Sequence, residues 1–226
     1  MLWFRADFLK VEDGMLIFEG VEKITQDFRN ALVTIGNFDG VHLSHQHICR
    51  KLAAEAKKAG KKSLVITFDP HPKMILHPNI HPFYLITTRN EKMALLEKCG
   101  VDATVVITFD EAYSKTTAEQ FVCDFLWKQL AITKIIIGHD YVFGQARQGN
   151  DAFLKKHGRK LGFAVEVIEA FKIDDQIVSS TLIRNFILAG NLPAAAKFLG
   201  RYYNVAGPVT SGAGRGAGLG YPTANV

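Results

Sequence analysis

Short apolar runs alternate with amphipathic stretches along most of the chain. The runs are rich in β-branched residues and end at glycine, proline or aspartate, which is typical of strands buried in a parallel sheet. We predict such strands over residues 32–35, 63–68, 103–109, 134–138 and 163–168. Because a helical pattern separates consecutive strands, the chain is predicted to be an α/β protein with a Rossmann-like, doubly wound parallel sheet.

Capping sequences mark several helix starts. Thr88 and Thr117 each open a capping box ahead of an amphipathic stretch, and Gly100 is predicted to close the first of these helices. Further helices are expected over 150–162, after Ser179-Ser180 and at Asn191-Pro193. A short strand is expected over residues 15–18, and a long polar connection is expected to follow residue 72, to about Thr87.

The sequence changes character after Gly200. Residues 201–209 alternate like an antiparallel strand, and glycine then occupies every second position from 212 to 220. We interpret this segment as the incomplete start of a second, β-type domain; for the glycine run itself, a flexible linker is the alternative. The expected divisions are 1–186 for the α/β domain, 187–200 for a linker helix region and 201–226 for the start of the β domain.

Residues 33–47 form the most informative stretch. An apolar strand breaks at Gly36, turns through Gly40 and reaches His42 and His45, after which a helical pattern begins. A strand, a glycine turn and a helix start together present backbone N–H groups to an anion, and two imidazoles add donors at the same place. We therefore predict a phosphate site. The alternatives are ordinary surface or capping histidines, or a metal site that draws on His47, His71, His77 and His81.

The metal alternative is weak, because no acidic or cysteine ligand stands at a recurrent zinc spacing. A P-loop is excluded, since G-x-x-x-x-G-K-[ST] does not occur in the sequence.

Three more unusual stretches follow predicted strands: residues 69–72 (DPHP), 138–144 (GHDYVFG) and 178–184 (VSSTLIR). The carboxyl ends of parallel strands share one edge of a sheet, so these stretches predict a single nucleotide-sized site. Tyr141 and Phe143 can stack on a planar ring, or Phe143 can face the core. Asp140 can orient that ring, hold Mg²⁺ or cap the loop.

The hydroxyls after residue 178 have two interpretations as well. Ser179, Ser180 and Thr181 with Arg184 make an anion clamp on one helix turn, but the same serines would serve as a plain N-cap.

Charge and cysteine usage narrow the class of protein. The net charge of +5 comes from short Lys and Arg pairs at predicted helix ends, which suits anionic small molecules such as ATP better than nucleic acid. Three cysteines without a C-x-x-C motif indicate a reducing compartment. No apolar run reaches the length of about 18 residues that a membrane span needs. We expect a cytoplasmic protein with neither a membrane nor a nucleic-acid partner; the oligomeric state stays open.

Taken in order, these motifs resemble the bifunctional bacterial riboflavin kinase/FAD synthetase family. GNFDGVHLSH resembles the family's G-x-F-D-G-x-H-x-G-H motif; TFDPHP, GHDYVFG with Gly149-Asn150, and VSSTLIR resemble its later motifs. GPVTSGAGRGAGLGYPTAN is similar to the start of the family's riboflavin kinase domain. The resemblance implies a nucleotidylyltransferase domain that makes FAD and pyrophosphate from FMN, ATP and Mg²⁺. A β-barrel domain that makes FMN from riboflavin would follow it.

The resemblance also implies roles for individual residues. His42, His45 and Arg184 would be catalytic, with the histidines binding ATP phosphates while the FMN phosphate attacks directly. ATP would be bound by Gly36, Phe38, Asp39, Gly40, Ser44, Ser180 and Thr181. The flavin side would consist of Asp69, His71, Asp140, Tyr141 and Phe143. Thr223 and Asn225 would be ATP/Mg²⁺ residues of the kinase domain.

Two departures from the family pattern matter. Ser44 replaces the motif's glycine, where its hydroxyl can cap the helix but its Cβ would crowd the triphosphate. The chain as given ends before the family's kinase glutamate, so we expect it to lack riboflavin kinase activity. A non-catalytic flavin or nucleotide sensor is the alternative from another class. An adenylyltransferase for pantetheine phosphate or nicotinate mononucleotide is disfavoured by the PTAN segment, and RNA binding by the scattered charges.

Overall fold

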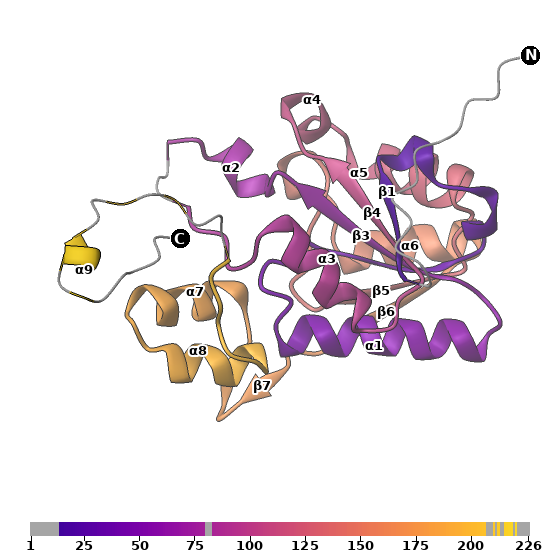
Figure 1. The fold of residues 1–226 in the computed structure, drawn as a ribbon. Coiled ribbons are helices and arrows are strands. Elements are labelled where there is room, and N and C mark those ends of the chain that lie inside the picture. The colour runs from indigo at the N-terminus through magenta and orange to yellow at the C-terminus, as the bar shows by residue number, and fades with distance from the viewer. Residues whose placement is uncertain are drawn as a thin grey trace, which may run out of the picture.

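Strands that are apolar on both faces pair into one six-stranded sheet whose neighbours all run parallel. The computed structural model describes residues 14–79 and 83–206 and, beyond them, residues 210, 212, 215–218 and 220. The strand order is β1-β4-β3-β2-β5-β6 (Figure 1). The strands are β1 (Leu16–Glu19), β2 (Leu32–Ile35), β3 (Ser63–Asp69), β4 (Ala103–Thr108), β5 (Lys134–Gly138) and β6 (Ala164–Ile168). The predicted doubly wound α/β fold is confirmed.

Helices cover both faces of the sheet. α1 (Leu43–Lys58) and α3 (Arg89–Glu97) pack on one face through Leu52 and Leu96. The π-helix η3 (Phe121–Gln129), which continues α5 (Ala118–Gln120), packs on the other face with α6 (Asp151–Leu161). The strand order reverses direction at β2, whose two neighbours are β3 and β5. Ligands of such sheets bind beyond the carboxyl ends of the strands at this switch point.

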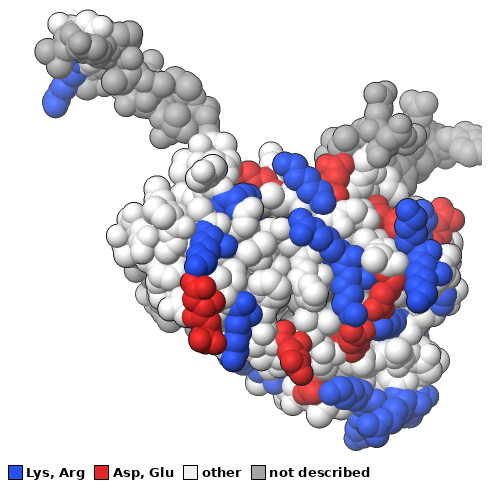
Figure 2. Space-filling view, turned by 90° about the horizontal axis from the view of Figure 1, so that it is seen from below, with Lys and Arg blue, Asp and Glu red and all other residues white. Residues whose placement is uncertain are grey.

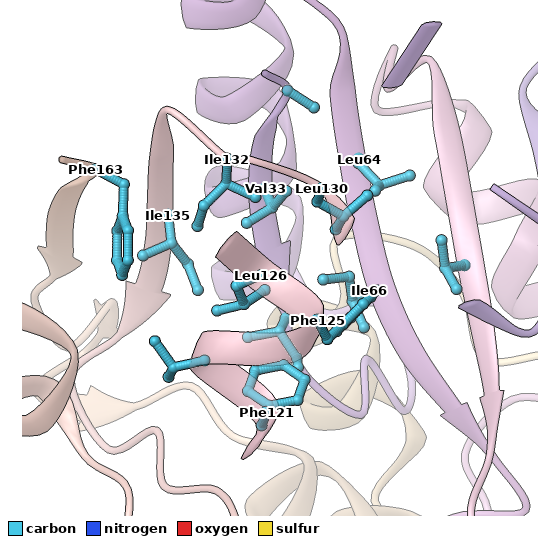
Figure 3. Packing of buried hydrophobic residues seen from close by; sticks show 14 of the residues in the cluster. Val33, Leu64, Ile66, Phe121, Phe125, Leu126, Leu130, Ile132, Ile135 and Phe163 are labelled. Carbon is cyan, nitrogen blue, oxygen red and sulfur yellow. The ribbon is translucent and has the colours of Figure 1, made fainter. Parts of the chain in front are cut away.

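The larger core lies under η3. Phe121, Phe125 and Leu126 on this helix point towards Ile66 and Ile135 of the strands (Figure 3). All five side chains are less than 9% exposed. Truncation of a buried phenylalanine to alanine typically costs about 3–5 kcal/mol, so this layer holds the sheet rigid behind the site.

A smaller apolar cluster joins the last helices to the segment that precedes α3. α7 (Ser180–Leu188) and α8 (Leu192–Leu199) pack through Ile183 and Phe198 against Ile86. The two-stranded hairpin β7 (Lys172–Ile173) and β8 (Gln176–Ile177) precedes them and was not predicted. The expected boundary after residue 186 falls within α7, and the division into domains stays a prediction.

The local signals for helix starts were reliable. Both capping boxes, at Thr88 and Thr117, are present with reciprocal hydrogen bonds. The connection after residue 72 begins with α2 (Pro72–Leu76), which His71 caps and which was not predicted. The remaining short helices are η1 (Val21–Lys23), η2 (Gln26–Phe28), α4 (Glu111–Ser114), η4 (Gln145–Arg147) and α9 (Arg215–Gly218).

The strand predicted over 201–209 is wrong over 201–206, where the backbone forms no strand, and residues 207–209 lie outside the described part. Alternation alone does not make a strand, because its backbone groups need a partner strand. Here the side chains find other partners: Arg201 donates to the Gly40 carbonyl, and Asn204 donates to Glu91.

Surface charges of both signs are mixed. Figure 2, which shows the molecule from below, has Lys and Arg side chains interspersed with Asp and Glu. One network joins Lys51 and Lys134 to Glu55 and Glu166. Within the described ranges, no helix combines the length and the apolar character that a membrane crossing requires.

Candidate active site

The turn after β2 brings the chain into α1 through unusual backbone angles. Gly40 has φ of 82°, and the non-glycine residues Phe38 and Val41 have φ of 49° and 36°. Phe38 and Val41 are nevertheless buried, so packing holds the turn in a conformation that an isolated peptide would avoid. The turn aims the first residues of α1 at the switch point of the sheet.

His42 and His45 lie together at the start of α1. Their rings stack with centroids 3.6 Å apart, and the Phe38 ring meets His45 edge-on at 5.0 Å. His42 is the N-cap, as the capping-histidine alternative allowed, and Ser44 is not: the Nδ1 of His42 accepts the His45 backbone N–H at 3.4 Å. Because Nδ1 is an acceptor, a neutral His42 carries its proton on Nε2 and can donate it to a ligand.

Both imidazoles are neutral near pH 7. Burial lowers the pKa of His42 to about 3, and the nearby Arg201 guanidinium adds to this effect. Burial also lowers the pKa of His45 well below its usual value, with further contributions from His42 and Lys92. The Nδ1 atom of His45 is buried and has no hydrogen-bond partner among the residues that the structure describes. These surroundings favour an anionic ligand.

Asp39 acts as the anchor of Arg184. An Arg184 Nη2 lies 2.6 Å from the Asp39 carboxylate, which also accepts the backbone N–H groups of Ile86 and Thr87. The side chains of Asp39 and Arg184 are only 3% and 12% exposed. Ser180 donates its hydroxyl to the Asp39 carbonyl at 2.9 Å, which fixes the start of α7 beside the turn.

A cavity of about 660 Å³ lies at this edge of the sheet, a size typical of sites for small molecules. Twelve of the predicted residues line it: Gly36, Phe38, His42, Ser44, His45, His71, Asp140, Tyr141, Phe143, Ser180, Thr181 and Arg184. Asp39, Gly40 and Asp69 do not, since Asp39 binds Arg184, Gly40 contacts Thr87 and Arg201, and Asp69 pairs with Arg89. Thr223 and Asn225 lie outside the described residues.

The aromatic end of the cavity follows β5. Tyr141 stacks on Phe143 with centroids 5.6 Å apart, and Phe143 also packs against Phe121. Phe143 therefore packs in the core and lines the cavity at once. The side chain of Asp140, by contrast, is 82% exposed. Burial lowers the pKa of His71 to about 4, so this histidine too is neutral near pH 7.

Two cations near the histidines were not predicted. Lys92 is a buried residue of α3, and its ammonium group donates to the Phe68 carbonyl at 3.1 Å. Burial lowers the pKa of Lys92. Arg201 follows α8 and donates to the Gly40 carbonyl at 2.8 Å. No sequence signal marks either residue, because Lys92 lies within an ordinary amphipathic stretch and Arg201 within the segment assigned to another domain.

A second, more open hollow of about 1070 Å³ lies at the opposite edge of the sheet. Several of its charged residues are already paired: Arg29 donates to the carbonyls of Lys128 and Gln129, and Lys62 pairs with Asp102. The carboxyl-end cavity, with its unpartnered imidazole nitrogen, is therefore the better candidate site.

Comparisons with known proteins identify the family of the chain. The sequence matches the FAD synthetase family over residues 24–182 and the riboflavin kinase family over 199–226. The bifunctional riboflavin kinase/FMN adenylyltransferase of Buchnera aphidicola subsp. Schizaphis graminum is 37% identical over 213 residues, which are 94% of this chain and 68% of that protein. The Escherichia coli K12 protein of the same description is 33% identical, with the same coverage.

A solved structure has a similar fold. It is described as a macrolide-efflux protein from Streptococcus pneumoniae, has a TM-score of 0.79 and is 28% identical to this chain. The similarity covers 93% of this chain and 68% of that one.

Proposed function

This chain belongs to the FAD synthetase family, whose members transfer the adenylyl group of ATP to FMN, and we propose that its cavity at His42 and His45 carries out this transfer. One observation carries the assignment of the site. Two stacked, neutral imidazoles lie at the start of α1, at the switch point of the sheet, with Arg201 and Lys92 as their cationic neighbours. Arg184 lines the same cavity. This is the environment that a triphosphate requires.

ATP binds with its phosphates at the start of α1. His42 and His45 donate to the phosphate oxygens, while Arg184, held in place by Asp39, closes over them with Ser180 and Thr181 from α7. An oxygen of the FMN phosphate attacks the α-phosphorus, and the bond from that phosphorus to the oxygen bridging to the β-phosphate breaks. Pyrophosphate leaves, and FAD remains. No proton has to move in this step, so neutral imidazoles suffice as donors to the developing charge.

The flavin occupies the aromatic end of the cavity. Tyr141, stacked on Phe143, offers a flat apolar wall, and His71 closes the other side as a neutral ring. The distribution of groups supports this orientation: the donors and cations lie at the histidine end, and the aromatic side chains lie towards β5.

Mg²⁺ fits the donors at the mouth of the cavity. Asp140 supplies an exposed carboxylate there, and Mg²⁺ commonly binds through one or two carboxylates together with substrate phosphates. The ion would neutralise phosphate charge. Asp39 is not available for this role, because its oxygens already accept three hydrogen bonds.

ATP, FMN and riboflavin are the small molecules that this family's reactions use. The match to riboflavin kinase over residues 199–226 is partial, and part of it, including 221–226, lies outside the described residues. We place the protein in the cytoplasm, since Cys49, Cys99 and Cys123 are all free thiols.

The test is chromatographic. The purified chain is incubated with ATP, Mg²⁺ and FMN, and FAD and pyrophosphate are quantified for wild type and for His42→Ala and His45→Ala. Removal of one such donor typically costs about 10²–10³-fold in rate. His47→Ala is the matched control, because His47 is exposed on the same helix and does not line the cavity. Wild-type rates in both alanine variants would disprove the assignment, and ATP binding without FAD formation would support the sensor alternative.

A further inference from the structure

Three side chains with metal-binding atoms meet where the end of α5 packs beside α6, away from the histidine pair. Glu119 lies in α5, Cys123 follows four residues later in η3, and His157 comes from α6. One carboxylate oxygen, the Sγ atom and one ring nitrogen all lie within 4.8 Å of one another. Glu119 and Cys123 share a helix face because they are four residues apart. His157 approaches them from the neighbouring helix.

His157 is oriented as metal-binding histidines are. Its Nδ1 atom lies 2.9 Å from the Phe153 carbonyl oxygen, which can only accept, so Nδ1 carries a proton. Its Nε2 atom lies 2.9 Å from the Glu119 carboxylate. A nitrogen lone pair and a carboxylate at this distance need a cation between them, either a proton or a metal ion. A backbone carbonyl that fixes the other ring nitrogen is the usual outer-shell partner of a metal-binding histidine.

The sulfur atom completes a mixed set of donors. Cys123 Sγ lies 3.5 Å from the other oxygen of Glu119. Zinc bonds of about 2.0–2.3 Å place such ligand atoms about 3.4–3.7 Å apart in a tetrahedral site. The ligand atoms need to move apart only slightly to reach these distances. The Glu119 side chain can make this movement because it is 62% exposed. A bound divalent cation favours the thiolate form of a cysteine, which is the form that binds metal.

We propose that Glu119, Cys123 and His157 form a binding site for a divalent transition-metal ion of the zinc class. Nitrogen, sulfur and oxygen donors together select such an ion over Mg²⁺ or Ca²⁺, and water takes the fourth position. Binding releases the thiol proton to solvent, along with any proton held on His157 Nε2.

The bound ion ties α6 to η3 next to the flavin end of the cavity. His157 stacks on Phe153 at 4.1 Å, and Phe153 in turn meets Phe143 of the cavity wall at 6.0 Å. The site is distinct from the Mg²⁺ position proposed at Asp140, and its ion contacts neither substrate. Its role is to hold together the two helices that support the aromatic wall.

Cobalt(II) provides the direct test, because a thiolate bound to it gives a charge-transfer band in the near ultraviolet. The full chain, first stripped with a chelator, is titrated with Co²⁺. The band should saturate at one ion per chain, disappear on addition of Zn²⁺, vanish in Cys123→Ser and need at least ten-fold more Co²⁺ in His157→Gln. Cys99→Ser and His47→Gln are the matched controls and should bind as wild type does. Absence of the band, or its survival in Cys123→Ser, would overturn the proposal.

Thermal unfolding gives a second readout that does not depend on cobalt. Zn²⁺ at about a hundred times its Kd should raise the Tm of wild type by about 5–10 °C. Cys123→Ser and Glu119→Gln change half-buried and exposed positions and should fold, yet they should lose most of this rise. An equal rise in Tm in wild type, Cys123→Ser and Glu119→Gln would mean that zinc binds elsewhere and would refute the site. This outcome decides the question even if His157→Gln does not fold.

Discussion

Two of the buried histidines, His42 and His157, have neighbours of opposite charge. His42 and His157 are 4% and 7% exposed, so burial alone does not distinguish them. His42, stacked on His45, has Arg201 nearby, and the nearest carboxylate on its turn, Asp39, is directed to Arg184. His157 instead faces the Glu119 carboxylate and the Cys123 thiol. A neutral imidazole among cations binds an anion, whereas an imidazole among anionic donors binds a proton or a metal ion.

The largest expected effect comes from removing the carboxylate of each site in turn. Asp39→Asn leaves the Arg184 guanidinium without its buried counter-ion and should lower the free energy of unfolding by about 3–5 kcal/mol. Glu119→Gln removes a carboxylate that is 62% exposed and should leave the unfolding midpoint nearly unchanged in metal-free buffer. Urea unfolding of both variants measures the difference. Equal unfolding midpoints for Asp39→Asn and Glu119→Gln would show that Asp39 does not stabilise the turn after β2.

The next effect concerns acid stability. His42 has a pKa of about 3 in the folded protein and about 6.5 when unfolded, so its contribution is complete above pH 6.5 and is lost as the pH falls from 6.5 towards 3. At pH 5.5 the loss from this one histidine is on the order of 1 kcal/mol.

Urea unfolding at pH 7.5 and 5.5 should therefore show a smaller decrease for His42→Asn than for wild type, by that amount. Other titrating groups cancel in this difference. The exposed His47→Asn serves as the control and should keep the wild-type decrease. An unchanged decrease in His42→Asn would mean that His42 is charged in the folded protein.

A smaller effect is expected from the cation beside His42. Arg201→Gln removes a guanidinium that binds the Gly40 carbonyl and lies near the phosphate end of the cavity. The KM for ATP should rise about five-fold, roughly 1 kcal/mol, while kcat stays within about two-fold. Lys57→Gln, the same change of charge at the exposed end of α1, should leave both constants as they are. A fall in kcat with unchanged KM would place Arg201 in the chemical step instead.

What could be predicted from the sequence was mainly local. The strand before Gly36 and the capping boxes at Thr88 and Thr117 depend on residues within a few positions of each other, and the structure confirms them. The convergence of the stretches around His42, Tyr141 and Arg184 on one cavity was also predictable, because the geometry of a parallel sheet brings its strand ends together.

What could not be predicted depends on contacts between distant residues. Asp39 looked like a pocket residue, yet it anchors Arg184, 145 positions away. Arg201 lay in an alternating segment that was wrongly assigned to a strand, and it binds the Gly40 carbonyl instead. His157 was overlooked because its partners, Glu119 and Cys123, stand on another helix at no recurrent zinc spacing. Patterns along the chain report which face a residue occupies, but not which distant side chain meets it.

The smallest expected effect tests the residue at which the anion site departs from its family. Ser44 lines the cavity near the start of α1, and since His42 already caps the helix, its hydroxyl is not needed there. Ser44→Gly should relieve crowding of the triphosphate and lower the KM for ATP by about three-fold, which corresponds to about 0.6 kcal/mol. Glycine also weakens a helix, so Ala54→Gly on the exposed side of α1 is measured beside it to report that cost alone. Tighter ATP binding in Ser44→Gly only would show that its side chain limits the anion site; unchanged or weaker binding would show that the phosphates lie clear of Ser44.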